Sequence, residues 1–242
     1  MMPWFLWNGT DSRVMGAVVS AYPARTRAEE RVTTVTIPGR SGVLTVPEGT
    51  EEPVFGAVTL TLGGWLRPGS DVRALLRWLQ GSGTLVLGND PGYSHAARIT
   101  SAVTLTDEAD GWRSFTVSFT AEPFRRMYPA PTAGRAVTSG ERVYNPGDLR
   151  VPAVITLRGG FSAVLTVGDT AVTLEDITGG VLLDWESGDC WLLDENGDPA
   201  ESAGTHVLGE KQYLEAGYTT IGWETTSGAV DSAVLTLNWR FF

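Results

Sequence analysis

Polar and apolar residues alternate along much of the first half of the chain, and this pattern predicts a β-sheet. Residues 114–121 alternate without a fault, and residues 58–62 repeat the pattern. A period of two is typical of strands that bury one face and expose the other. Shorter strands are expected at residues 84–87 and 97–100. We therefore expect a sheet with one buried face.

One stretch of the first half has the period of a helix instead. Ser70 is the expected N-terminal cap of the helix, and the negative charge of Asp71 is expected to stabilise that end. Gly81 is expected to stop the helix. The apolar positions of this helix form a stripe along one face, which predicts that the helix packs against the sheet. Its apolar positions are Val72, Leu75, Leu76 and Leu79.

The second half has no comparable helical stripe and consists of short apolar runs separated by turn residues. Seven or more short strands with turns between them are typical of a β-sandwich. The expected strands are residues 153–157, 162–167, 171–174, 181–185, 190–193, 218–223 and 233–241.

A change in composition marks the expected boundary between two domains. Residues 123–131 contain three prolines, which favour extended backbone and exclude regular strand pairing. In residues 1–130, twelve arginines balance twelve carboxylates, whereas residues 131–242 contain six basic and sixteen acidic residues, which accounts for the whole formal charge of −10. We therefore predict domains at 1–130 and 131–242. The acidic surplus disfavours binding to nucleic acid or to anionic membranes, and a solvated acidic face explains it most simply.

The region around residues 31–56 has an unusual pattern. Residues 31–37 alternate as in a strand, and Pro38 then removes a backbone donor, so that pairing must stop or reach an edge. Gly39 and Gly42 permit a sharp change of direction. A polar, Pro-containing loop at 47–53 is expected to follow, before strand-like sequence resumes at Val54. This arrangement predicts an extension, residues 38–56, that reaches a neighbouring molecule.

Catalytic and metal-binding patterns are weak in this sequence. The histidines, His95 and His206, belong to no recognisable catalytic motif, because neither a G-x-S-x-G nor an H-E-x-x-H sequence occurs. Cys190 is the sole cysteine, which excludes an internal disulfide or a Cys-based zinc site, and it is expected as buried filler. We predict no cofactor, no metal, no catalytic residue and no membrane-spanning segment, and the chain lacks a signal-peptide pattern.

The acidic stretch at residues 184–198 invites two sharper hypotheses. Calcium binds clustered carboxylates beside a glycine turn, but Gly197 does not stand where an EF-hand requires it. Glycoside hydrolysis would need two carboxylates at a fixed separation, with Asp184, Asp189 and Asp194 as the candidates. The simpler interpretation is a pair of hairpin turns, and it is preferred.

Several segments together resemble one family, the distal tail proteins of long, non-contractile-tailed bacteriophages. The order and spacing of these segments carry the resemblance over nearly the whole chain. The similar segments are residues 5–12, 22–23, 27–31, 37–42, 91–93, 119–124, 144–147, 152–155 and 214–221.

The resemblance implies a structural role in a virion rather than an enzymatic one. It implies an N-terminal tail-tube-like β-sandwich with one α-helix, six copies of which form a ring, and a C-terminal galectin-like β-sandwich outside that ring. The implied partners are the tail tube protein, a tail-tip hub protein and receptor-binding proteins, with DNA passing through the lumen without specific binding. The implied location is the phage tail tip, after assembly in the bacterial cytoplasm.

The expected subunit interface lies in the extension. It comprises Pro38, Gly39, Arg40, Gly42, Val54 and Phe55.

Two alternatives belong to other functional classes. A tail-tube subunit would usually have a single domain, which argues against that identity. A carbohydrate-binding module would stack exposed tryptophans on sugar rings, with Trp185, Trp191 and Trp223 as the candidates.

Overall fold

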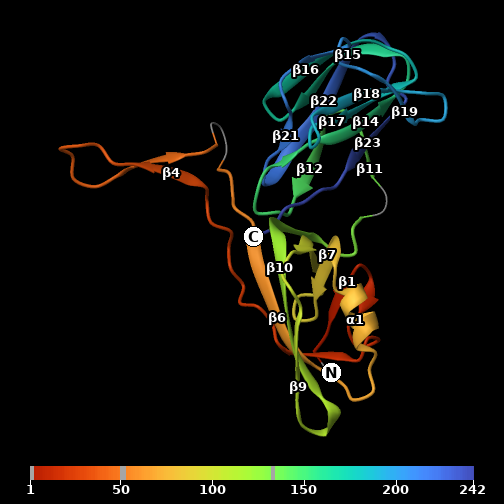
Figure 1. Cartoon of the computed structure of the whole chain (residues 1–242). Helices are drawn as coiled ribbons and strands as arrows, with labels where there is room; N and C mark the ends of the chain where they lie inside the picture. The colour runs from red at the N-terminus through yellow and green to blue at the C-terminus, as the bar shows by residue number, and fades with distance from the viewer. Residues whose placement is uncertain (1–2, 50–52, 132–133) are drawn as a thin grey trace. The chain divides into compact units, whose positions relative to one another are not determined.

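The computed structural model describes residues 3–49, 53–131 and 134–242 of the chain, and its backbone forms two compact units (Figure 1). Unit 1 comprises Met1–Pro129 together with Phe242, and unit 2 comprises Ala130–Phe241. Both units are built mainly of β-strands, so the predicted fold class is confirmed. The ring-forming and galectin-like roles given to the two halves remain predictions.

Unit 1 contains one antiparallel sheet of eight strands that curves around a core. Its longest strand is β10 (Arg113–Met127), which pairs with β6 (Val58–Leu66) through residues 113–121 and with β8 (Tyr93–Ile99) through its later residues. The alternation at 114–121 therefore marks the part of β10 that lies over the core. The order along the sheet is β2 (Thr10–Asp11), β1 (Phe5–Trp7), β7 (Gly81–Leu87), β8 (Tyr93–Ile99), β10 (Arg113–Met127), β6 (Val58–Leu66) and β3 (Ala17–Ala21), with β9 (Thr104–Asp107) paired to β10.

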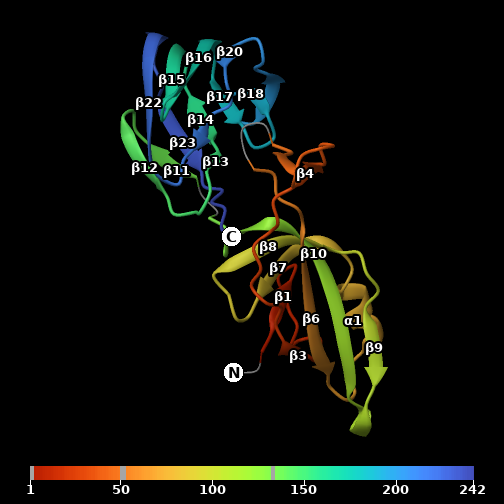
Figure 2. The same cartoon turned by 90° about the vertical axis from the view of Figure 1, so that its left-hand side faces the viewer.

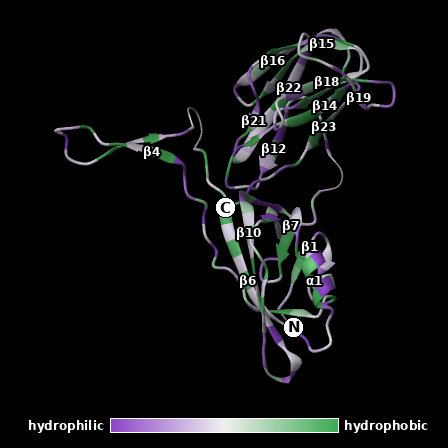
Figure 3. Cartoon of the chain, in the orientation of Figure 1, coloured by the Kyte–Doolittle hydropathy of each residue, from purple (hydrophilic) through white to green (hydrophobic). Residues whose placement is uncertain are grey.

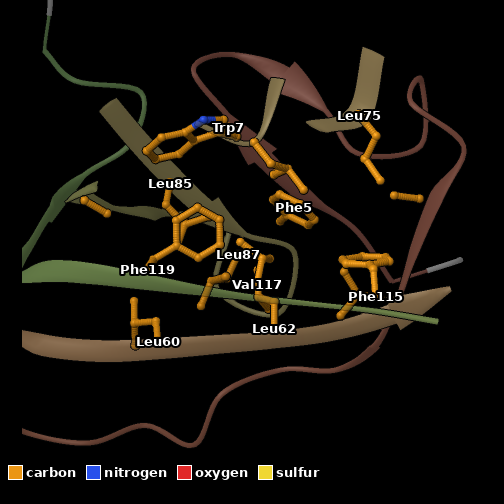
Figure 4. Close-up of a cluster of buried hydrophobic side chains, with 14 of the residues drawn as sticks. Phe5, Trp7, Leu60, Leu62, Leu75, Leu85, Leu87, Phe115, Val117 and Phe119 are labelled. Carbon is orange, nitrogen blue, oxygen red and sulfur yellow. The ribbon is translucent and has the colours of Figure 1, made fainter. Parts of the chain in front are cut away.

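The core of unit 1 is aromatic at its centre (Figure 4). Phe5 and Trp7 point inward from β1, and Phe119 comes from β10. The Phe119 ring lies 5.1 Å from the Trp7 ring and 6.2 Å from the Phe5 ring, both edge to face, which is a favoured geometry for aromatic pairs. The alternation of each strand thus delivers its large side chains to one interior.

The predicted helix is present as α1 (Val72–Trp78), and a 3₁₀ turn, η1 (Ala109–Gly111), precedes β10. The cap differs from the expectation, since the Asp71 carboxylate accepts hydrogen bonds from the backbone N–H groups of Arg73 and Ala74. Leu75 is fully buried, but Leu76 is 40% exposed, so its place in the predicted stripe is wrong. Leu75 and Leu76 are adjacent in the sequence and therefore point in different directions from the helix. The face of this short helix that contacts the sheet is too narrow to bury both side chains.

Replacing Asp71 with alanine should destabilise unit 1 by about 1 kcal/mol, because two backbone donors at the start of α1 lose their acceptor. The matched change, Ser70→Ala, should have little effect if Asp71 alone caps the helix. Urea denaturation of both variants measures the difference. A larger loss in the Ser70 variant would contradict the assignment of the cap.

Unit 2 is a sandwich of two principal sheets, as Figure 2 shows. The alternating burial of β15 (Phe161–Val167) places Phe161, Ala163, Leu165 and Val167 in the interior. A further pair, β13 (Val151–Pro152) and β21 (Tyr213–Leu214), lies beside them. One sheet has the order β11 (Arg135–Val137), β23 (Ser232–Thr236), β14 (Val154–Arg158), β17 (Gly180–Asp184), β18 (Asp189–Leu193) and β19 (Pro199–Ser202); the other has β12 (Glu141–Asn145), β22 (Gly217–Gly228), β15 (Phe161–Val167), β16 (Thr170–Ile177) and β20 (Val207–Gly209).

The last predicted strand, residues 233–241, is too long. Strand β23 ends at Thr236, although Trp239 and Phe241 remain buried. Alternation alone could not reveal this end, because buried side chains also alternate where the backbone has left the sheet.

Candidate functional site

The segment at residues 32–47 forms a β-hairpin, which we call the arm. Strand β4 (Val32–Val35) pairs with β5 (Leu44–Pro47), and these two strands pair with no other strand of the described chain. The prediction of a loop from residue 47 onward, with only one strand before it, is therefore incomplete, because a second strand returns along the first. Figure 1 shows the arm as the orange hairpin labelled β4.

The arm is exposed throughout and has no core beneath it. Opposite residues in an antiparallel pair share a face, so the register Val35↔Leu44 and Thr33↔Val46 sets three apolar side chains on one side. Val35 is 44% exposed, Leu44 41% and Val46 44%. We call these three residues the apolar face; green and purple segments alternate along the arm in Figure 3.

The opposite side of the arm is more polar near its tip. Thr34 lies directly across from Thr45 on this side, which also carries Val32 opposite Pro47 toward the base. A free-standing hairpin has no interior to fill, so the three side chains of the apolar face stay partly exposed to solvent within a single chain.

The six predicted interface residues fall at two separate places. Pro38, Gly39, Arg40 and Gly42 lie in the connection between β4 and β5, at the tip of the arm, where all four are exposed. The backbone N–H of Arg40 donates to the carbonyl of Ile37 at 3.1 Å, and both glycines have positive φ (79° and 86°), so the tip needs them. Residues 50–52 of the predicted extension lie outside the described residues.

Val54 and Phe55, in contrast, lie at the base of the arm. The backbone N–H of Arg31 donates to the Val54 carbonyl at 2.6 Å, and Phe55 bridges to Glu30. Phe55 also packs edge to face on Phe124 and Phe242, at 5.4 and 5.5 Å between ring centroids. Phe55 thus holds the base of the arm on unit 1, and an interface role for it remains a prediction.

The sequence interpretation missed the apolar face itself. Val43, Leu44, Thr45 and Val46 form a β-branched and apolar run between Gly42 and Pro47, which is a strand signal bounded by turn residues. The loop prediction was based on the polar, Pro-containing residues 47–53 that follow this run, and the run itself was assigned no strand.

The candidate catalytic groups occupy unremarkable positions. His206 lies beside the backbone carbonyl of Glu175, with Nδ1 at 2.9 Å. Burial, reinforced by Asp184 and Asp189, raises the pKa of the Cys190 thiol, which lowers its reactivity. These surroundings favour structural roles for both side chains.

The acidic stretch forms two hairpin turns on either side of strand β18, as the simpler interpretation expected. The Asp184 carboxylate accepts backbone N–H groups of Glu186 and Ser187, and Asp194 accepts those of Asn196 and Asp198. Backbone donors hold the pKa of Asp194 below its usual range. Among the described residues, no three His, Cys, Asp or Glu side chains gather closely enough to hold a metal ion.

One of the three tryptophans proposed for sugar stacking is unsuited to it. Trp185 is only 9% exposed, so its ring cannot present a face to a ligand, and Trp191 and Trp223 are half-buried. The exposed aromatic pair of unit 2 is instead Tyr144 and Tyr218, whose ring centroids lie 5.0 Å apart.

No helix in the described ranges is long and apolar enough to cross a bilayer.

The two units together define a mainly β fold, with one curved sheet and helix in unit 1 and a two-sheet sandwich in unit 2. A solved structure with this fold is that of the SPP1 Dit (gp 19.1) protein, described as a paradigm of the hub adsorption apparatus in phages that infect Gram-positive bacteria. The match has a TM-score of 0.71 and 15% sequence identity, and it covers 97% of this chain and 98% of the SPP1 chain. The resemblance found in the sequence is therefore confirmed at the level of the fold.

Sequence comparisons alone gave no such result. No protein-family model matches the chain, and no curated protein matches it.

Proposed function

We propose that this chain is a structural protein of a bacteriophage tail, a distal tail hub of which six copies close into a ring. The observation that carries the proposal is the fold, which matches SPP1 Dit over nearly the full length of both chains. The role is assembly rather than catalysis. The ring joins the tail tube to the tail-tip and receptor-binding apparatus, and DNA passes through its lumen.

The arm supports the assembly part of this proposal. A ring arises when one surface of each subunit binds a different surface of the next, with a rotation that closes. The apolar face supplies one such surface, since covering Val35, Leu44 and Val46 removes apolar area from water. The edges of the hairpin add unpaired backbone groups that a neighbouring strand can meet.

The two domains divide the work in this proposal. Residues 1–130 form the ring, and residues 131–242 lie outside it, toward tip or receptor-binding proteins. The charge pattern agrees with this division, because the whole formal surplus of −10 belongs to residues 131–242. The protein is assembled in the host cytoplasm and resides at the tail tip of the virion.

Native mass spectrometry and electron microscopy of the purified protein test the proposal. We expect a species of six times 26.0 kDa that appears as a ring in projection. A protein that stays monomeric at every concentration, and that forms no ring when mixed with tail tube and tip partners, would contradict it.

A further inference from the structure

A cavity of about 270 Å³ opens in unit 1, beside the segment that leads to the arm. Its apolar lining includes Val58 and Leu60 of β6 and Leu87 of β7. A cavity of roughly 150 Å³ lined by apolar side chains holds a benzene molecule. The cavity in unit 1 therefore has room for a ring of that size together with a small polar group.

The charged groups of the cavity are mainly cationic. Arg25, Arg27 and Arg125 all line it. Asp90 lies between two of them, with its carboxylate 2.5 Å from Arg125 and 3.5 Å from Arg25. The Asp90 carboxylate thus pairs with the guanidinium groups of Arg25 and Arg125, and it does not pair with Arg27.

Arg27 is held in a defined orientation without an acidic partner. Its Cζ lies 4.1 Å from the centroid of the Phe242 ring, and no carboxylate pairs with it in the described part of the chain. Stacking on an aromatic ring uses the flat face of a guanidinium and leaves its in-plane N–H donors available. Those donors form a planar fork that matches the two oxygens of a carboxylate.

The remaining polar groups do not cancel this positive charge. Glu122 also lines the cavity and lies 3.7 Å from Arg126, but the three arginines still outnumber the two carboxylates of the lining, Asp90 and Glu122. Burial, with a smaller contribution from Arg125, lowers the pKa of His95 to about 4 despite the opposing effect of Asp90. His95 is therefore neutral at pH 7 and adds no charge of either sign.

We propose that this cavity binds a carboxylate attached to an apolar group of about the size of a benzene ring. Arg27 holds the carboxylate, and Val58, Leu60 and Leu87 surround the apolar group. Such a ligand is either a free aromatic acid or an acidic side chain beside an aromatic one in a partner polypeptide. The inference does not depend on the proposed hexameric assembly, because every residue that lines the cavity belongs to unit 1 of a single chain.

Titration of the full-length protein with two anionic probes and one neutral probe tests this inference, followed by ¹H–¹⁵N NMR. The probes are 3-phenylpropionate, acetyl-Phe-Glu-amide and the neutral 3-phenylpropan-1-ol. At least one anionic probe should bind about tenfold or more tightly than the alcohol, since charge-assisted hydrogen bonds contribute that much. Preference for the free acid or for the peptide identifies the source of the carboxylate.

Variants at Arg27 decide whether the cavity is responsible. Arg27→Gln should weaken the anionic probe about tenfold or more, Arg27→Lys should have an intermediate effect, and Arg73→Gln, on the exposed side of α1, should have none. Unchanged spectra away from the cavity show that each variant is folded. The inference is overturned if neither anion binds, if the alcohol binds equally well, or if both Arg27 variants bind like the wild type.

Discussion

Replacing Val35 and Leu44 together with serine should abolish the ring while leaving both units folded. The two residues lie opposite each other on the apolar face, and they are 44% and 41% exposed, so no core of their own subunit depends on them. If a neighbouring subunit covers them, the double change removes apolar burial from every contact of the ring. Because serine keeps the strand geometry and introduces no charge, the hairpin itself should survive.

The expected size of this effect is large. Full burial of one Val or Leu side chain contributes about 1.5–3 kcal/mol. Because Val35 and Leu44 are 44% and 41% exposed, covering the exposed part of both contributes about 1–2.5 kcal/mol to each contact, and the double change loses it. A loss of about 1.5 kcal/mol weakens one contact roughly tenfold. A closed ring multiplies the effect, since all its contacts must form together. Mass photometry at graded concentrations should then find only single chains where the wild type forms rings.

The matched control is Thr34→Ser with Thr45→Ser. These threonines form the next cross-strand pair of the same hairpin, but on its other side. The control variant should assemble like the wild type, with an equal thermal midpoint. Rings of normal stability from the Val35 and Leu44 variant, or equal loss of rings in both variants, would contradict the role of the apolar face.

The sequence predicted those parts of the fold in which the periodicity of apolar residues matches the pattern of buried side chains. Residues 114–121 alternate and lie on β10, with Phe115, Val117 and Phe119 buried. The helix was placed correctly by the same logic, but its cap was not. Ser70 and Asp71 are both good caps, and only the backbone geometry determines which side chain reaches the free N–H groups.

The arm shows why the candidate site was only partly predictable. The kink at Pro38 and the glycines at 39 and 42 marked a change of direction, and the structure has its hairpin tip there. A polar loop was expected beyond it, because residues 47–53 are polar and contain two prolines, and no strand was assigned to residues 43–46. The pairing of Val35 with Leu44 is a relation between two segments, and neither segment specifies it alone.

The cavity of unit 1 is less predictable from the sequence than the arm is. Arg27 and Phe242 are separated by almost the whole chain, yet the guanidinium of one stacks on the ring of the other. Asp90 likewise takes its partners from two different segments, at Arg25 and Arg125. Local sequence patterns do not specify contacts between residues that are far apart in the chain, so only the folded structure could suggest this site.

Replacing Phe119 with alanine should destabilise unit 1 by about 3–5 kcal/mol, the largest stability effect that we expect from one substitution. Phe119 is fully buried in β10 and contacts two aromatic neighbours, Phe5 and Trp7. Its removal forfeits apolar burial and also leaves a void, because the hydrogen-bonded strands of the curved sheet relax only partly around a missing side chain. A loss of this size is a large fraction of the 5–15 kcal/mol that stabilises a typical domain.

Urea denaturation followed by tryptophan fluorescence measures the effect of Phe119→Ala, since the buried Trp7 ring lies 5.1 Å from Phe119. Thr116→Ala is the matched control, because Thr116 belongs to the same strand but faces solvent, and its cost should stay below about 0.5 kcal/mol. Phe119→Leu should fall between the two, as leucine refills part of the void. A cost below 1 kcal/mol for Phe119→Ala would mean that the aromatic centre of unit 1 is not the source of its stability.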